Sequence, residues 1–159
     1  MRLALYQPDI PQNLGAAIRL SAAFETDLDV IEPCGFPLSD KAIKRAAMDY
    51  GACAKVSHHS GWGDFLAFRH DVLPQTTRLI LFTTRSASSV YDFRFAPDDI
   101  LLMGRESAGV PDDVHAAADH RLFIPISVHA RSINVINAAA MALGEALRQT
   151  NSFPKRPET

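Results

Sequence analysis

Residues 124–138 read IPISVHARSINVINA: an apolar segment, a short polar run and the start of a second apolar segment. The first segment is typical of a strand, and the second continues with the spacing of a helix. Between them, Ser132, Asn134 and Asn137 fall within six residues, at the spacing of adjacent helix turns. Because α/β proteins place ligand chemistry where a strand leads into a helix, we predict a binding site at this junction.

Short apolar runs alternate with helix-like segments along the rest of the chain. The predicted strands are Leu3–Tyr6, Leu28–Ile31, Ala54–His58, Arg78–Thr83, Ile100–Met103 and Leu122–Ile124. The predicted helices are Leu14–Glu25, Lys41–Met48, Trp62–Arg69, Pro111–Ala118 and Ile133–Gln149. This alternation indicates the α/β class, with a mostly parallel sheet and helices on both of its faces. We expect residues 1–151 to form one domain and residues 152–159 to be a frayed tail.

The composition is that of an ordinary globular protein. Of the 159 residues, 47% are hydrophobic and 21% are charged, and the net charge is −2. No global basic field indicates a nucleic acid, although a local basic face can hide in a balanced total. No apolar run approaches the roughly 20 residues that span a bilayer, and no signal peptide is evident. We therefore expect a cytoplasmic protein with no membrane partner.

The cysteines and histidines form no metal-binding pattern. Cys34 and Cys53 lack Cys-x-x-Cys spacing, so we interpret both as buried free thiols. The six histidines show no ligand spacing, and we predict no metal site.

Gly104 and Gly109 have the spacing of a phosphate-binding P-loop. The second glycine is followed by Val-Pro instead of Lys and Ser or Thr, so we exclude a nucleoside triphosphatase. Residues 61–63 lack the third glycine of a dinucleotide fingerprint, and no Gly-x-Ser-x-Gly elbow supports a serine hydrolase. The loop at Gly104 is a place where a ligand can lie close to the backbone, although a turn with positive φ would explain either glycine alone.

Several helical residues have both a structural and a functional interpretation. Asn13 is a suitable N-cap for the first predicted helix, and Arg19 on that helix is either a solvated arginine or part of a site. Lys41, Lys44 and Arg45 share one face of the next predicted helix, which is either solvated or suited to phosphate contact.

The last predicted helix carries an apolar stripe, with Ala140 and Gly144 one turn apart. The two small residues suit close helix packing, either inside the fold or against a second copy of the chain.

Three segments, taken in order, resemble the signature motifs of the SPOUT (SpoU–TrmD) methyltransferases. They are residues 8–19, which read PDIPQNLGAAIR, residues 104–111, which read GRESAGVP, and residues 124–138. The closest resemblance is to the TrmL-like branch, which 2′-O-methylates the wobble nucleotide of tRNA, and it covers nearly the whole chain. The sequence departs from this branch at Gly144, where many relatives carry an aromatic residue.

The resemblance implies a homodimer and a parallel α/β sheet whose C-terminal part forms a deep trefoil knot. It also implies that S-adenosylmethionine binds in the knot, with S-adenosylhomocysteine as product and no metal. The cofactor contacts would come from Phe82, Thr83, Gly104, Glu106, Ile124, Ile126, Ser132 and Ile133.

The implied reaction is methyl transfer to the ribose 2′-oxygen of nucleotide 34, a cytidine or a modified uridine, in the anticodon loop of tRNA. A guanidinium keeps its proton and is a poor base, so we expect Arg19 to clamp the adjacent phosphate and stabilise the developing oxyanion. Asn13, Ser132 and Asn134 are expected to orient the ribose and shape the site. The expected RNA contacts are Lys41, Lys44 and Arg45.

Two alternatives stay open. The first is a SPOUT 2′-O-methyltransferase that acts on a different tRNA or rRNA ribose. The second is a non-catalytic RNA- or cofactor-binding module in an enzyme-like fold, against which the presence of Arg19, Ser132 and Asn134 argues.

Overall fold

The computed structural model of the protein describes residues 1–38, 55–86 and 88–155. The strands are β1 (Arg2–Tyr6), β2 (Asp27–Ile31), β3 (Val56–His59), β4 (Leu79–Phe82), β5 (Ile100–Met103) and β6 (His120–Leu122). The helices are α1 (Pro11–Ala23), α3 (Trp62–Val72), α4 (Asp112–Ala117) and α5 (Val135–Thr150), with a 3₁₀ turn, η2 (Val90–Asp92).

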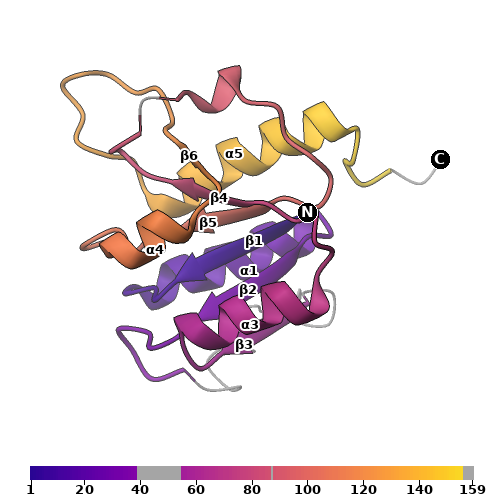
Figure 1. The fold of residues 1–159 in the computed structure, drawn as a ribbon. Coiled ribbons are helices and arrows are strands. Elements are labelled where there is room, and N and C mark those ends of the chain that lie inside the picture. The colour runs from indigo at the N-terminus through magenta and orange to yellow at the C-terminus, as the bar shows by residue number, and fades with distance from the viewer. Residues whose placement is uncertain (39–54, 87, 156–159) are drawn as a thin grey trace.

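All pairings within the described six-stranded sheet are parallel, in the order β3-β2-β1-β5-β4-β6 (Figure 1). The first three strands progress from β1 toward one edge, and the last three occupy the other half of the sheet. The direction of progression therefore reverses between β1 and β5. Ligands of open α/β sheets bind beyond the carboxyl ends of the strands at such a reversal. The predicted α/β class and parallel sheet are confirmed.

Each face of the sheet is covered by a different pair of helices. Strand residues such as Leu3, Val30 and Leu101 pack with the buried faces of α1 and α5. Their chain neighbours Ala4, Ile31 and Leu102 point to the other face and pack with residues of α3 and α4. Because both faces are buried, β1, β4 and β5 read as almost continuous apolar runs in the sequence.

The predicted strands and helices that the structure describes agree with it to within a few residues. The predicted helix at 41–48 and Cys53 lie outside the described residues. Cys34 is half-buried and free, and burial raises the pKa of its thiol to about 11. No helix in the described ranges is long and apolar enough to cross a membrane.

The last strand is displaced from its predicted position. We predicted Leu122–Ile124, but β6 pairs with β4 only through His120–Leu122. The next residue, Phe123, instead exchanges backbone hydrogen bonds with the segment that follows β4: its N–H donates to Ser88 at 2.9 Å, and its carbonyl accepts from Val90 at 3.0 Å. The chain therefore leaves the sheet before Ile124, which becomes free to line a cavity.

The first helix also begins earlier than predicted, because Pro11 occupies its first turn. Proline suits this place, since its missing N–H has no partner there in any helix. The N-cap is Ile10, so the prediction of Asn13 as N-cap is wrong. The Asn13 side chain is turned inward and bonds to two other segments, as described below.

A buried ionic cluster ties together the three strands at one side of the sheet. The Asp29 carboxylate, fully buried in β2, accepts hydrogen bonds from Arg2 Nε at 2.7 Å and Arg2 Nη2 at 3.0 Å. His59 Nε2 of β3 lies 2.8 Å from the same carboxylate. Arg2 also reaches Asp27, whose side chain is 35% exposed, at 2.6 Å. A buried carboxylate with three partners is costly to disturb, whereas an exposed one is not.

Asp29→Asn should lower the free energy of unfolding by about 3 kcal/mol, because it removes the fully buried carboxylate of the cluster and leaves the Arg2 guanidinium with only the more exposed Asp27 as counter-charge. Asp27→Asn removes a carboxylate from the same arginine at a half-exposed position and should cost less than about 1 kcal/mol. Urea unfolding of both variants measures the difference. Equal losses would contradict the assignment of Asp29 as the anchor of the cluster.

Candidate functional site

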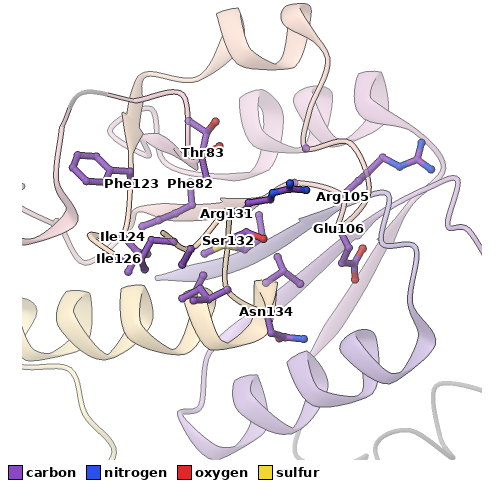
Figure 2. A pocket seen from close by; sticks show the side chains of 18 of the residues that line it. Phe82, Thr83, Arg105, Glu106, Phe123, Ile124, Ile126, Arg131, Ser132 and Asn134 are labelled. Carbon is purple, nitrogen blue, oxygen red and sulfur yellow. The ribbon is translucent and has the colours of Figure 1, made fainter. Parts of the chain in front are cut away.

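A cavity of about 710 Å³ opens at the carboxyl ends of β4, β5 and β6, beside the point where the strand order reverses. Its walls come from four parts of the chain: the start of α1, the loop after β4, the loop after β5, and the segment that joins β6 to α5 (Figure 2). Ligand sites commonly have this volume and this place in a doubly wound sheet.

The eight residues predicted to bind a cofactor all line this cavity: Phe82, Thr83, Gly104, Glu106, Ile124, Ile126, Ser132 and Ile133. So do three of the four predicted catalytic residues, Asn13, Ser132 and Asn134. The fourth, Arg19, is exposed on α1 and is not part of the cavity wall. Lys41, Lys44 and Arg45 lie outside the residues that the structure describes.

The loop after β5 is a tight turn that closes on itself. The backbones of Arg105 and Gly109 exchange two hydrogen bonds of 2.9 Å. Gly109 has φ of +67°, which favours glycine. A Cβ on Gly104 would lie 2.8 Å from the carbonyl carbon of Gly109, so no side chain fits there. The turn itself therefore explains the glycine spacing that resembles a P-loop.

Glu106, inside this turn, connects it to the first helix. Its Oε2 accepts a hydrogen bond from the backbone N–H of Asp9 at 2.8 Å. Its Oε1 accepts one from the side-chain amide of Asn13 at 2.7 Å. Both carboxylate oxygens are thus occupied by donors from the segment that follows β1, and Asn13 is only 7% exposed.

Asn13 in turn contacts the polar run before the last helix. Its Oδ1 accepts a hydrogen bond of 3.0 Å from Nδ2 of Asn134. Asn134 is the N-cap of α5, where its Oδ1 accepts from the N–H groups of Ile136 at 2.8 Å and Asn137 at 3.3 Å. One chain of side-chain hydrogen bonds, Glu106–Asn13–Asn134, therefore joins the three sequence motifs. These contacts fit the predicted role of shaping the site, and contact with a ribose stays a prediction.

A second link between the first and second motifs is ionic. Arg105 Nη2 lies 2.6 Å from Oδ1 of Asp9, and the hydroxyl of Ser107 donates to Oδ2 of Asp9 at 2.5 Å. Hydrogen bonds from Arg105 and Ser107 lower the pKa of the Asp9 carboxyl to about 2. Asp9 thereby holds the turn through contacts that do not involve Asn13.

Sequence reasoning did not select Asp9, Arg105 or Arg131 as site residues. Arg105 and Arg131 line the cavity, and both belong to the motifs on which the resemblance depends. Each directly precedes a predicted site residue in the sequence, Glu106 or Ser132, and this adjacency could have indicated them. The partners of Asp9 are 96 and 98 residues away in the sequence, so no local pattern could reveal them.

The low pKa of Asp9 predicts how its contribution depends on pH. The folded-state pKa is depressed from 3.8 to about 2, so the stability that the carboxylate gives is fully present above about pH 5 and is lost as the pH falls toward 2. The difference in unfolding free energy between the wild type and Asp9→Asn should be constant from pH 7 to pH 5 and shrink at pH 3. Asp92→Asn, at an exposed position, is the control. A difference that grows on acidification would contradict the assignment.

Comparison with known proteins agrees with the motifs. The model of the SpoU rRNA Methylase family matches residues 1–144. A protein of Beijerinckia indica named tRNA (cytidine(34)-2'-O)-methyltransferase is 52% identical over 153 residues, which cover 96% of this chain and 94% of that protein.

Solved structures resemble the fold over most of the chain. One, described as "Structural insights into the 2-OH methylation of C/U34 on tRNA", is 40% identical, with a TM-score of 0.84, and the match covers 93% of this chain and 94% of that one. Another is the SpoU methyltransferase AviRb from Streptomyces viridochromogenes in complex with the cofactor AdoMet. It is 26% identical, with a TM-score of 0.80, and the match covers 94% of this chain and 60% of that one.

One family model matches residues 1–144, the part of the chain that holds the sheet, the cavity at its carboxyl edge and the three motifs around that cavity. The chain belongs to the SpoU methylase family.

Proposed function

We propose that the protein transfers a methyl group from S-adenosylmethionine to the ribose 2′-oxygen of the wobble nucleotide, position 34, of a tRNA. The observation that carries this proposal is the gathering of all eight expected cofactor residues around one cavity, in a chain 52% identical to a protein named for this reaction on cytidine 34. The AdoMet complex of AviRb, which has a similar fold, supports the choice of methyl donor.

The walls of the cavity fit such a donor. Phe82, Ile124 and Ile126 form an apolar surface of the kind that accepts an adenine ring, and Gly104, which has no side chain, lines the same cavity. When bound, S-adenosylmethionine supplies a methyl group on a positively charged sulfur. The chain's task is to hold the acceptor ribose in line with that methyl group and to help remove one proton from the hydroxyl.

Ser132 is the polar side chain best placed to meet the ribose. It lines the cavity and is exposed, and the described residues offer its hydroxyl no recorded hydrogen bond. A serine hydroxyl can either donate to or accept from a ribose oxygen. Asn13 and Asn134, whose amides bond to each other, hold the walls on either side.

Arg19 is proposed to clamp the phosphate next to the acceptor ribose. It lies on α1, six residues after Asn13, and the described residues give its guanidinium no recorded ion pair. A guanidinium can bind a phosphate through two parallel hydrogen bonds and also stabilise negative charge that develops on the 2′-oxygen. Lys41, Lys44 and Arg45 are retained as proposed RNA contacts.

The proposal includes a homodimer and a C-terminal trefoil knot, as in the family that the motifs resemble. Helix α5 supports the homodimer, because Ala140 and Gly144 are only partly buried and Met141 is 40% exposed. Two small residues one turn apart allow a second helix to approach closely.

Incubation with unfractionated tRNA and labelled S-adenosylmethionine, followed by location of the label, tests the reaction. We expect the label on the ribose of nucleotide 34. A label on another ribose would identify a different SpoU 2′-O-methyltransferase. If no ribose is labelled, or if calorimetry detects no binding of the donor or of S-adenosylhomocysteine, the proposal is wrong.

Arg19→Ala should reduce kcat/KM for tRNA by roughly 100-fold while leaving donor affinity unchanged, because the clamp acts on the acceptor. Arg19→Lys should recover little, since a point charge does not replace a two-pronged donor. Arg94→Ala, an exposed arginine away from the cavity, is the matched control. Near-normal methylation by Arg19→Ala would remove Arg19 from the chemistry.

Asn13→Asp should weaken donor binding by about tenfold or more, because the new carboxylate would face the carboxylate of Glu106 in a buried place. Gln12→Glu adds the same charge at the exposed neighbouring position and should leave donor affinity unchanged. Calorimetric titration with S-adenosylhomocysteine measures both. Unaltered affinity in Asn13→Asp would show that the Glu106–Asn13–Asn134 chain does not organise the cavity.

A further inference from the structure

Arg131 is a charged residue of the cavity wall that the proposed function does not use. It lies in the segment between β6 and α5, directly before Ser132, and its side chain is exposed. In Figure 2 this side chain points toward the part of the cavity where Arg105 and Glu106 lie.

The other charged groups of the wall already have partners in the protein, a counter-charge for Arg105 and neutral hydrogen-bond donors for Glu106. Arg105 lies 2.6 Å from the Asp9 carboxylate. Both oxygens of Glu106 accept hydrogen bonds from the segment after β1. Arg131, by contrast, has no recorded hydrogen bond or ion pair with any residue in the described ranges. A cation on a cavity wall without an acidic partner favours an anionic ligand.

The start of α5 adds to the positive potential at the same wall. Val135, the first residue of this 16-residue helix, lines the cavity four residues after Arg131. The N-terminus of a helix carries a partial positive charge, which the neutral cap Asn134 does not remove. Two independent sources of positive charge therefore converge beside Ser132.

We infer that Arg131 binds the phosphodiester adjacent to the acceptor ribose, as a second phosphate-positioning residue besides Arg19. This inference rests on the proposed function. The 2′-oxygen and the 3′-phosphate belong to neighbouring carbons of one ribose, so a group that holds this phosphate beside Ser132 also fixes the nucleophile. The planar guanidinium matches the two free oxygens of a phosphodiester.

An RNA phosphate fits Arg131 better than the carboxylate of the methyl donor does. Arg131 is exposed, as suits a contact with a macromolecule that arrives from solvent. Phe82, by contrast, is 8% exposed at the apolar wall proposed for the adenine, so we expect the adenine end of the donor to lie deeper in the cavity than Arg131.

The test compares Arg131→Gln and Arg131→Lys with Arg94→Gln, which removes the same charge at an exposed position away from the cavity. Three quantities are measured for each full-length variant: tRNA affinity as a function of salt, methylation kinetics, and the affinity for S-adenosylmethionine and for its decarboxylated analogue. Thermal unfolding checks that each variant is folded.

Arg131→Gln should weaken tRNA binding about tenfold and reduce the slope of log K against log salt by about one, the signature of one lost phosphate contact. The affinity for both donors should stay within about twofold of the wild type, because the contact is made to the acceptor. Arg131→Lys should recover part of the salt slope but less of kcat, since it keeps the charge without the fork. Arg94→Gln should match the wild type.

Two results would overturn the inference. If Arg131→Gln binds and methylates tRNA like the wild type, Arg131 holds no phosphate. If it loses affinity for S-adenosylmethionine but not for the decarboxylated analogue, its anion is the donor's carboxylate. Both results are read against a wild type that methylates nucleotide 34. If the wild type itself does not methylate that nucleotide, the proposed function fails, which is a separate outcome.

Discussion

The hydrogen bond between Glu106 and Asn13 holds together parts of the chain that are 93 residues apart and, with the ion pair between Asp9 and Arg105, joins two walls of the cavity. If this bond were lost, Glu106 would keep one hydrogen bond to the segment after β1, the one from the backbone N–H of Asp9. Asn13 also accepts a hydrogen bond from Asn134, which caps the first turn of α5. Because Asn13 is buried, a lost partner there is not replaced freely by water, and the three walls behave as one unit.

The sheet explains why these walls meet. In a parallel sheet every strand ends at the same edge, so the loops after β1, β4, β5 and β6 emerge side by side. The strand order reverses between β1 and β5, which separates the helices that follow and leaves a crevice between them. The departure of the chain from β6 at Phe123 then carries Ile124 and Ile126 over this crevice. A continued strand would have kept both residues in the sheet.

The electrostatics of the site reconcile a net charge of −2 with the anionic substrate that we propose. Arg105 is neutralised by Asp9, and Glu106 keeps its negative charge but is held by neutral donors from the segment after β1. What remains is local, namely Arg131 and the N-terminus of α5. A balanced chain can therefore present a local cationic group at the cavity wall, because an ion pair cancels its own field at a distance while a guanidinium without an ion pair does not.

The sequence by itself determined the α/β class, the parallel sheet and the eight wall residues, since apolar runs and motif resemblance are properties of the chain. Local patterns failed where long-range contacts decide. Asparagine is a common N-cap residue, yet the helix starts at Pro11, and the Asn13 side chain bonds to Glu106 and Asn134 instead. Only the tertiary structure could pair Asp9 with Arg105 and leave Arg131 uncompensated, because a charge's partner is set by distance in space and not by spacing along the chain.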